Sequence, residues 1–347
     1  MLISKIKKGI RSFISDKNKK KTTTIALEFL NLWIIQREFP MHYFSRFLYR
    51  TEFINYKDYI PTKKYFKLIT SDKIQNYFLV NILNNKLVFS FFCEKYNIST
   101  PKMTGFNSGS DFYLNNKKFT ILSNTELIFF FNDLFDKTNH PKIFIKNIGT
   151  KGGAGIFLLE RAFVEEQINS FGHLILSGSF IHQECIIQHQ KINKIYAHSV
   201  NTLRFDICMD NHKNCHLLGA VMRFGVGGSS IDNRSKGGFF VSIDTSSGRL
   251  LERGYKQMGF GGTELFAHPD TKYVFEGFQI PYFDEAKKLA MDMSNIIPNR
   301  LVGWDIAITP DGPIVIEGNH DSNITMSDVA YCGYLKHPVV KELIAVI

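Results

Sequence analysis

The sequence predicts a mixed α+β fold preceded by a mostly helical N-terminal region. Residues 22–80 contain no glycine and are rich in aromatic residues and lysine, which favours helices that break at Pro40 and Pro61. Beyond residue 140, short β-branched runs alternate with glycine turns, a pattern typical of strands. Residues 303–319 place a Pro-Asp-Gly turn between two such runs, which predicts a β-hairpin.

The composition is that of an ordinary globular protein. With 347 residues, of which 44% are hydrophobic and 21% charged, the chain is long enough for two or three subdomains. No apolar run reaches the roughly eighteen residues of a membrane span, and the N-terminus lacks the continuous apolar segment of a signal peptide. The five cysteines form no CxxC pair. We therefore expect a cytoplasmic protein without disulfides or a zinc site.

Most of the positive charge lies at the N-terminus. The formal net charge is +10, and residues 1–21 hold seven lysines, one arginine and one aspartate, which sum to +7. The rest of the chain is therefore nearly neutral, so we expect no nucleic-acid partner. Isoleucines at 3, 6, 10 and 14 recur at helical spacing. This basic amphipathic arm would lie on the anionic inner face of a membrane or dock on the protein's own body.

We expect three segments along the chain: the arm (1–21), the helical region (22–80) and an α+β domain (81–347) with a flap subdomain at about 140–190. Within that domain, a helix should run from Asn85 to about Tyr96, where a pre-proline segment follows. A helix near 124–135 should begin at a cap formed by Asn124 or Thr125. Strands are expected around 112–122, and further helices at about 160–171 and 283–296.

A glycine-rich loop joins two predicted strands in the flap. The strand 143–146 ends in Lys146 and leads into Gly149-Thr150-Lys151-Gly152-Gly153-Ala154-Gly155, and a second strand follows at 156–159. Successive N–H groups of such a loop can hold phosphate oxygens. The GxxxxGK[ST] order is absent and a strand follows the loop, so it is neither a P-loop nor a dinucleotide-binding turn. We expect a lid over a nucleotide.

Two arginines lie within apolar strands. Arg204 follows Asn201-Thr202-Leu203, and Arg223 lies in the run 220–224. An arginine in such a position usually has an anionic partner, which is a structural carboxylate such as Asp206 or a bound phosphate. The segment 180–187 is a strand or linker that could present backbone groups to a purine. The basic, glycine-rich loop 225–238 is suited to closing over a charged substrate.

The hairpin at 303–319 carries three oxygen donors at one end. Its turn brings Asp305 opposite the region of Glu317 and Asn319, and the latter two point to the same face because they are two residues apart on a strand. Two carboxylates and an amide suit Mg²⁺, whose remaining positions substrate phosphates can fill. The alternative is an exposed hairpin with polar ends.

In this order, the elements resemble the ATP-grasp superfamily, and most closely its sugar-transfer-associated branch, found among bacterial surface-polysaccharide genes. The resemblance covers about residues 83–325 and implies an ATP-grasp fold, in which two α+β subdomains clasp ATP. Six motifs carry it: Asn85-Lys86 with Ile98-Ser99-Thr100-Pro101, the Lys146 strand and its flap, Gln183-Glu184-Cys185-Ile186, Asn201-Thr202-Leu203-Arg204, the Arg223 strand with 233–238, and Asp305 with Glu317-Gly318-Asn319.

The resemblance implies a role for each matching residue in nucleotide binding. Lys86 and Lys146 would contact the ATP phosphates beneath a flap formed by Gly152, Gly153 and Gly155. Adenine would bind main-chain groups of Glu184 and Ile186 in the motif that begins at Gln183, and the ribose would bind Gln190 or His189 where relatives commonly have an acidic residue.

It also implies the catalytic and metal residues. Two Mg²⁺ ions would be held by Asp305, Glu317 and Asn319, with Glu317 bridging them. Arg204 and Arg223 would stabilise the transferring phosphoryl group. Asn233 and Lys236 would lie near the acceptor.

The function that the resemblance implies is an ATP- and Mg²⁺-dependent carboxylate–amine ligase, which forms an acyl phosphate and then an amide. We expect it to attach an amino acid or similar group to a sugar or glycan precursor. A phosphotransferase that uses His320 or Asp321 as general base is the first alternative. A non-catalytic scaffold that binds nucleotide and, through its arm, a membrane is the second.

Overall fold

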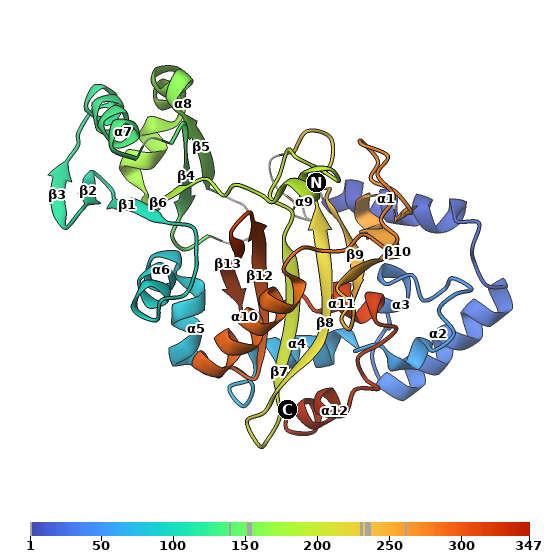
Figure 1. Ribbon diagram of the computed structural model, residues 1–347. Helices are drawn as coiled ribbons and strands as arrows, with labels where there is room; N and C mark the ends of the chain where they lie inside the picture. Colours follow the sequence, from blue (N-terminus) through green and yellow to red (C-terminus); the bar gives the residue numbers. More distant parts are fainter. Residues whose placement is uncertain (1, 139, 151–154, 230–231, 233–236, 261) are drawn as a thin grey trace. The chain divides into compact units, whose positions relative to one another are not determined.

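The structure is a computed structural model of the 347-residue chain. It describes all residues except 1, 139, 151–154, 230–231, 233–236 and 261, and the side chains of residues 2–6 and 326 are also left out. The chain forms two compact units, which we describe separately (Figure 1). Unit 1 comprises residues 1–80, 188–313 and 318–347, and unit 2 comprises 81–187 and 314–317. Both contain helices and a sheet, which confirms the predicted α+β class.

Unit 1 is built on a seven-stranded sheet with the order β11-β10-β9-β8-β7-β12-β13. The β12–β7, β7–β8, β8–β9, β9–β10 and β10–β11 pairs are antiparallel. Asp305 lies opposite Arg204, and Arg223 lies opposite Phe240. Paired residues share a face, so charged residues of three strands meet on one side of the sheet. The strands are β7 (Leu203–Met209), β8 (Cys215–Phe224), β9 (Phe239–Asp244), β10 (Arg249–Lys256), β11 (Glu264–Leu265), β12 (Leu301–Thr309) and β13 (Gly312–Asn319).

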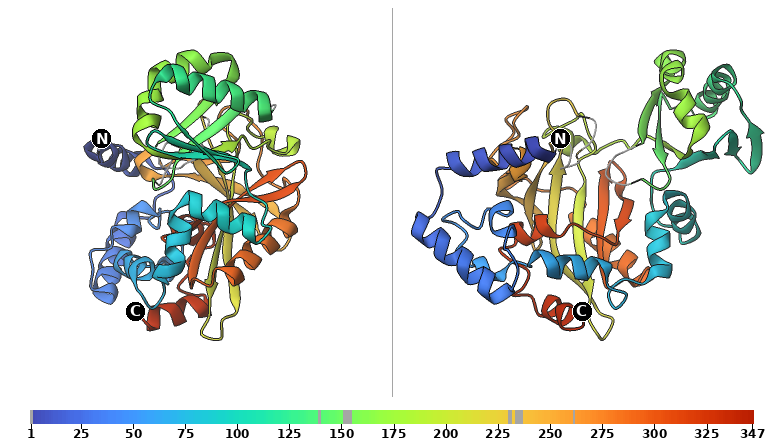
Figure 2. Two further views of the ribbon diagram at one scale, coloured as in Figure 1. Left: turned by 90° about the vertical axis from the view of Figure 1, so that its left-hand side faces the viewer. Right: turned by 180° about the vertical axis from the view of Figure 1, so that it is seen from behind.

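The two faces of this sheet are covered by different helices. Helix α10 (Phe283–Ile296) contacts β7, β8 and β12, and its Phe283 packs on Phe205 (Figures 1 and 2). Side chains alternate along a strand, so the neighbours of Phe205 face the other way. There Asp206 accepts hydrogen bonds from Ser322 and Ser327, and α11 (Thr325–Ala330) contacts β8 and β9.

The N-terminal region is helical, as predicted, and packs on the face that α11 covers. Leu32, Tyr43 and Tyr49 share a core cluster with Val221 and Phe240 of the sheet. The helices are α1 (Leu2–Ser15), α2 (Thr22–Gln36), α3 (His42–Ser45), η1 (Tyr56–Asp58), α4 (Thr62–Thr70) and α5 (Tyr77–Asn84). Elsewhere in unit 1 lie α9 (Gln190–Asn193), η4 (Met258–Phe260) and α12 (Pro338–Ala345).

A buried ion pair ties this region to the sheet domain. Arg46, at the C-cap of α3, forms a salt bridge with Asp328 of α11. Its guanidinium also donates to the carbonyl of Ile60 at 2.7 Å, and the Asp328 carboxylate accepts from the backbone N–H of Tyr334 at 2.7 Å. The exposed fractions of Arg46 and Asp328 are 5% and 0%. Such a pair is costly to break from one side, because the remaining charge stays buried without its partner.

Unit 2 contains a six-stranded antiparallel sheet with the order β3-β2-β1-β6-β4-β5. Helices α7 and α8 contact each other, and α8 also contacts β1 and β5. Their apolar side chains form one cluster with the sheet, and Phe131, Ile143 and Ile168 lie at its centre. The strands are β1 (Met103–Ser108), β2 (Asp111–Leu114), β3 (Lys117–Thr120), β4 (Lys142–Asn147), β5 (Ile156–Glu160) and β6 (Ser179–Glu184). The helices are α6 (Lys86–Lys95), α7 (Asn124–Thr138), η2 (Arg161–Phe163) and α8 (Val164–Ser177).

The cap of α7 differs from the prediction by one residue. The Ser123 hydroxyl accepts the N–H of Glu126 at 3.2 Å, and the Glu126 carboxylate accepts the N–H of Leu122 at 2.7 Å. The expected cap at Asn124 or Thr125 is therefore wrong. A serine three residues before a glutamate forms this reciprocal pair and fixes the start of the helix.

None of the helices in the described part of the chain combines the length and the apolar composition that crossing a bilayer requires.

His42 of unit 1 and His182 of unit 2 are buried and must stay neutral. Burial lowers the pKa of His42 to about 3, and Arg46 lowers it further. Burial likewise lowers the pKa of His182 to about 3; its ring packs on Phe131, and its Nε2 lies 3.1 Å from Asn107 Oδ1. In the unfolded chain both rings would protonate near the ordinary value of 6.5.

We therefore expect stability to fall as the pH drops below about 6.5. A histidine with a lowered folded-state pKa costs roughly 3 kcal/mol at a pH two units below its unfolded pKa, since only the unfolded chain takes up the proton. Urea denaturation between pH 7.5 and 4.5 measures the loss. His182→Gln should make the free energy of unfolding of unit 2 depend less on pH. If the variant and the parent lose the same stability between pH 7.5 and 4.5, His182 does not cause the loss. The exposed His212 provides the control, because His212→Gln should leave the curve unchanged.

Candidate functional site

Asp305 lies at the centre of a charged cluster on the unit 1 sheet. It is 1% exposed and accepts two hydrogen bonds from Arg204, from Nε at 2.5 Å and from Nη2 at 3.0 Å. Arg223 Nη2 lies 2.8 Å from the same carboxylate. We call these three residues the Asp305 cluster. The sequence predicted that both arginines lie on strands and have anionic partners. Asp305, on β12, pairs with both of them.

Two hydroxyl groups connect this cluster to further acids. Thr202 Oγ1 accepts from Arg223 Nε at 2.8 Å and donates to Asp232 Oδ2 at 2.5 Å. Ser322 Oγ accepts from Arg204 Nη1 at 3.3 Å and donates to Asp206 Oδ1 at 2.7 Å. Burial raises the pKa of Asp206, and Arg204 partly offsets the rise. Asp206 was predicted as a possible arginine partner, and Ser322 links it to Arg204.

Thr202 and Ser322 were not predicted as site residues. Thr202 is part of the motif that contains Arg204 and directly precedes β7, so its position two residues before that arginine was an available signal. Ser322 follows the hairpin by three residues, in a loop with no regular spacing. Nothing in its sequence neighbourhood indicates that it lies against Arg204.

The predicted metal donors lie on the hairpin β12–β13. Asn319 Nδ2 lies 3.5 Å from Asp305 Oδ2, and Glu317 lies two residues earlier on β13. Within the part of the chain that the structure describes, no group of three or more His, Cys, Asp and Glu side chains is arranged to hold a metal. The predicted set has only two carboxylates, and its third donor is an amide. These oxygen donors suit Mg²⁺, but Arg204 and Arg223 both engage Asp305. A metal at Asp305 would therefore compete with the guanidinium groups.

Unit 2 brings Lys86 and Lys146 into one electrostatic environment with Glu317. Burial lowers the pKa of Lys146 to about 8, Glu317 partly offsets this, and the like charge of Lys86 adds to it. Lys86 begins α6, where the Asn85 side chain caps the helix by accepting the N–H groups of Leu87 and Val88. Two lysines whose charges repel each other favour an anion between them, as a nucleotide phosphate would supply.

The described part of the flap is held by Asn147. Its side-chain oxygen accepts the N–H groups of Gly149 and Thr150, each at 3.1 Å, and its own N–H donates to the carbonyl of Gly155. Gly155 has a φ of 63°, and a Cβ there would lie 2.9 Å from the Asn147 Cβ, so glycine is required. The Lys86 ammonium donates to the carbonyl of Thr150. Gly152 and Gly153 lie outside the described residues.

The predicted adenine-binding segment is strand β6 and the residues after it. Gln183 is buried, and its Nε2 donates to the carbonyl of Pro101 at 3.2 Å. The Glu184 carboxylate pairs with Lys102 at 3.0 Å and His140 at 3.1 Å, and the Glu184 N–H donates to the carbonyl of Lys102. Because its N–H is already engaged, Glu184 can offer only its carbonyl for the predicted main-chain contact with adenine. Ile186 is half-buried and follows the strand.

Two of the remaining four predicted residues lie outside the described residues. Gln190 is exposed and begins α9, and His189 caps that helix by accepting the N–H of Lys191 at 3.1 Å. Of the two, His189 is thus the one with a structural role. Asn233 and Lys236 lie outside the described residues.

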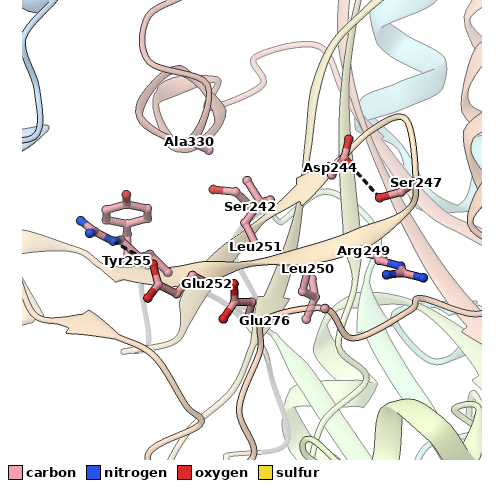
Figure 3. Close-up of a pocket in the computed structure, with 12 residues that line it drawn as sticks. Ser242, Asp244, Ser247, Arg249, Leu250, Leu251, Glu252, Tyr255, Glu276 and Ala330 are labelled. Atoms are coloured by element: carbon pink, nitrogen blue, oxygen red, sulfur yellow. Dashed lines mark hydrogen bonds and ion pairs between the residues drawn. The ribbon is translucent and has the colours of Figure 1, made fainter.

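Described residues of unit 1 line at least two surface cavities. The first has a volume of about 440 Å³ and is formed mainly by β9, β10 and the turn between them, with Ser242, Glu252 and Glu276 in its wall (Figure 3). None of the predicted site residues lines it. It therefore adds nothing to the predicted site.

The second cavity, of about 270 Å³, borders the site face of the sheet. Phe240 lines it and is the cross-strand neighbour of Arg223. Asn323 and Thr325, which follow the hairpin β12–β13, form another part of the wall. The helical N-terminal region contributes much of the rest: His42, Ser45, Arg46, Phe47, Thr62, Tyr65 and Phe66.

Comparison with known protein families identifies the family of this chain. Residues 69–342 match the sequence model of a family described as sugar-transfer associated ATP-grasp. The chain belongs to this family. The match confirms the resemblance predicted from the motif order. A search of curated proteins found no match.

Several solved structures of low sequence identity are similar to this chain. D-alanyl-alanine synthetase A from Vibrio cholerae is 10% identical, with a TM-score of 0.46 over 77% of this chain and 66% of its own. Biotin carboxylase from Campylobacter jejuni is 10% identical, with a TM-score of 0.46 over 77% and 46%. N5-carboxyaminoimidazole synthetase from Staphylococcus aureus is 10% identical, with a TM-score of 0.42 over 73% and 48%. The chain thus spans between about half and two thirds of the length of these proteins.

We expect two carboxylates of the hairpin to respond differently to neutralisation. Asp305→Asn removes the shared partner of two guanidinium groups and should destabilise unit 1 by about 3–5 kcal/mol. Glu317→Gln should instead abolish turnover of ATP with a small change in stability, because Glu317 is half-buried and was predicted as a bridging metal ligand.

Thermal unfolding and ADP release measure the two effects. Asp311→Asn, in the exposed turn of the same hairpin, is the matched control and should change neither. Full ATP turnover by Glu317→Gln would refute the metal assignment.

Proposed function

We propose that this protein is an ATP- and Mg²⁺-dependent carboxylate–amine ligase. The observation that carries the proposal is the Asp305 cluster, in which one buried carboxylate orients two arginines on the face of the sheet beside the metal hairpin. Phosphoryl transfer needs mainly positioned positive charge. Arg204 and Arg223 would stabilise the phosphoryl group, and Lys86 and Lys146 would hold the other phosphates of ATP.

Mg²⁺ would bind Glu317, Asn319 and Asp305 and would neutralise the phosphate oxygens. Arg204 and Arg223, which Asp305 positions on this face of the sheet, would bind the acyl phosphate that forms when the substrate carboxylate attacks the γ-phosphate of ATP and ADP is released. An amine captures the acyl phosphate and releases phosphate, which leaves an amide.

We propose the second cavity as the site of the carboxylate substrate. Of the described residues that line it, none is acidic and Lys256 is basic, while Arg46 is already paired with Asp328. This lining favours an anion over an amine. Its amides and hydroxyls, among them Gln257, Asn323 and Thr325, suit a polar substrate. In keeping with the family description, the amine or the carboxylate would belong to a sugar or glycan precursor.

A phosphotransferase that acts on a sugar hydroxyl is the second candidate, and one observation favours it. His320 and Asp321 directly follow Asn319, the predicted metal ligand, and their side chains approach to 4.0 Å, from His320 Nδ1 to Asp321 Oδ1. A histidine beside a carboxylate can act as a general base towards a hydroxyl.

Isotope transfer separates the two reactions. The protein is incubated with ATP, Mg²⁺, pooled amines and carboxylic acids, including sugar acids labelled with ¹⁸O in the carboxylate. A ligase must transfer one labelled oxygen to inorganic phosphate, because the acyl phosphate breaks at its carbonyl carbon. A kinase should yield a phosphorylated product without labelled phosphate. Release of ADP with a phosphorylated sugar and without labelled inorganic phosphate would therefore refute the ligase.

The cavity assignment has a separate test. Lys256→Gln should raise KM for the carboxylate substrate about tenfold through loss of a charge-assisted hydrogen bond and leave KM for ATP unchanged. The exposed Lys288 of α10 is the control position, since Lys288→Gln should alter neither constant. An equal effect of both substitutions would place the substrate elsewhere.

A further inference from the structure

Helix α2 is apolar on the side that faces away from the protein as well as on the side that packs. Ile25, Phe29 and Leu32 face the core that also contains Tyr43 and Val221. On the outer side, Leu27 and Ile34 are 69% and 76% exposed. Leu30 and Trp33 lie between them on the same stripe of the helix, at spacings of three and four residues, and are also exposed. A solvent-facing helix side normally carries polar residues.

Helix α1 extends this apolar surface. Its Ile10 and Ile14 are exposed, and its Phe13 packs against Phe44, the ring on which Phe29 of α2 also packs. The two helices lie on the same side of unit 1, and both views of Figure 2 agree with Figure 1 on this point. We call the exposed residues Ile10, Ile14, Leu27, Leu30, Trp33 and Ile34 the α1–α2 surface.

The exposed charges in the chain segment that forms this surface are all positive. Among the described side chains of residues 7–41, the exposed charged ones are Lys7, Lys8, Arg11, Lys17, Lys21 and Arg37.

The acids of the same stretch are turned inward. Asp16 pairs with Arg50 at 2.7 Å, and Glu28 pairs with Lys20 at 2.7 Å. Glu38 is buried and accepts the N–H of Lys63 at 3.0 Å. The surface therefore presents apolar side chains surrounded by uncompensated positive charge.

We propose that the α1–α2 surface binds an anionic lipid bilayer. The apolar side chains would enter the acyl boundary of the bilayer, and the flanking lysines and arginines would bind its negative headgroups. The hydrophobic and electrostatic contributions to the binding free energy add. Helix α2 has 15 residues, which at 1.5 Å per residue is too short to span a bilayer, so it lies in the plane of the membrane. Trp33 takes the position that tryptophan favours at such an interface.

A second copy of the chain fits this surface less well. A symmetric dimer would place the same lysines and arginines against one another. Like charges at an interface cost several kcal/mol. An anionic membrane instead attracts each exposed basic residue.

The chain contains its own probe for the test. It has two tryptophans; Trp304 is fully buried and donates to Ser294 Oγ at 2.7 Å, while Trp33 is 47% exposed. Full-length protein is mixed with vesicles of phosphatidylcholine alone or with about a third phosphatidylserine, and binding is measured by flotation and by tryptophan emission. We expect a blue shift and binding at least tenfold tighter with the anionic vesicles. Brominated lipids should quench Trp33.

The apolar contribution is tested by substitution. Ile34→Glu should weaken binding at least tenfold without loss of helical content, because the side chain is exposed. Phe129→Glu, at a site that is 70% exposed on α7 of unit 2, is the matched control and should bind vesicles as the parent does.

Three results would overturn the proposal. The first is the absence of binding to anionic vesicles, and the second is equal binding by Ile34→Glu and the parent. The third is a concentration-dependent blue shift in the absence of lipid, together with dimers in sedimentation, which would assign the surface to a second copy. All of these measurements are independent of ATP turnover, so the proposed ligase activity can fail without affecting them.

Discussion

Asp305 and the two arginines that it binds constrain how the whole of unit 1 is assembled. The carboxylate is buried and comes from β12, while its partners come from β7 and β8. A shift of one residue in either strand pairing would turn one of these charges to the opposite face, where α10 packs through Phe283 and other apolar side chains. An unpaired charge at that depth is more costly than the loss of several apolar contacts. The cluster therefore fixes the register of three strands, and with it the place where the hairpin presents Glu317 and Asn319.

The features that were predictable from the sequence are those set by neighbouring residues. The hairpin followed from its turn and alternating residues, and α6 followed from Asn85 and the proline that ends the segment after it. The pairing of both arginines with Asp305 was not predictable in the same way. Arg204 and Asp206 share a face because they are two residues apart, which made Asp206 a reasonable partner, whereas Asp305 lies opposite Arg204 only once β12 and β7 are in register.

The contacts that support the site depend on pairings over still longer stretches. Asp232 reaches Arg223 through Thr202, and Ser322 approaches Arg204 from 118 residues away. No local pattern specifies such pairs, because each depends on how separate strands and loops are brought together. Helix α2 shows the same limit. Its apolar residues indicated a helix, but only the packed structure distinguishes the side that faces the core from the side that faces outward.

The Arg46–Asp328 pair has a consequence for how this family varies. The family match begins at residue 69, yet Asp328 within that range is buried against a guanidinium from residue 46. A fragment that starts at the family boundary would leave this carboxylate buried without its partner. We therefore expect the helical region and α11 to vary together among relatives. Relatives without this N-terminal region should also lack an acidic residue at the position of Asp328, so the two features should be gained or lost as a pair.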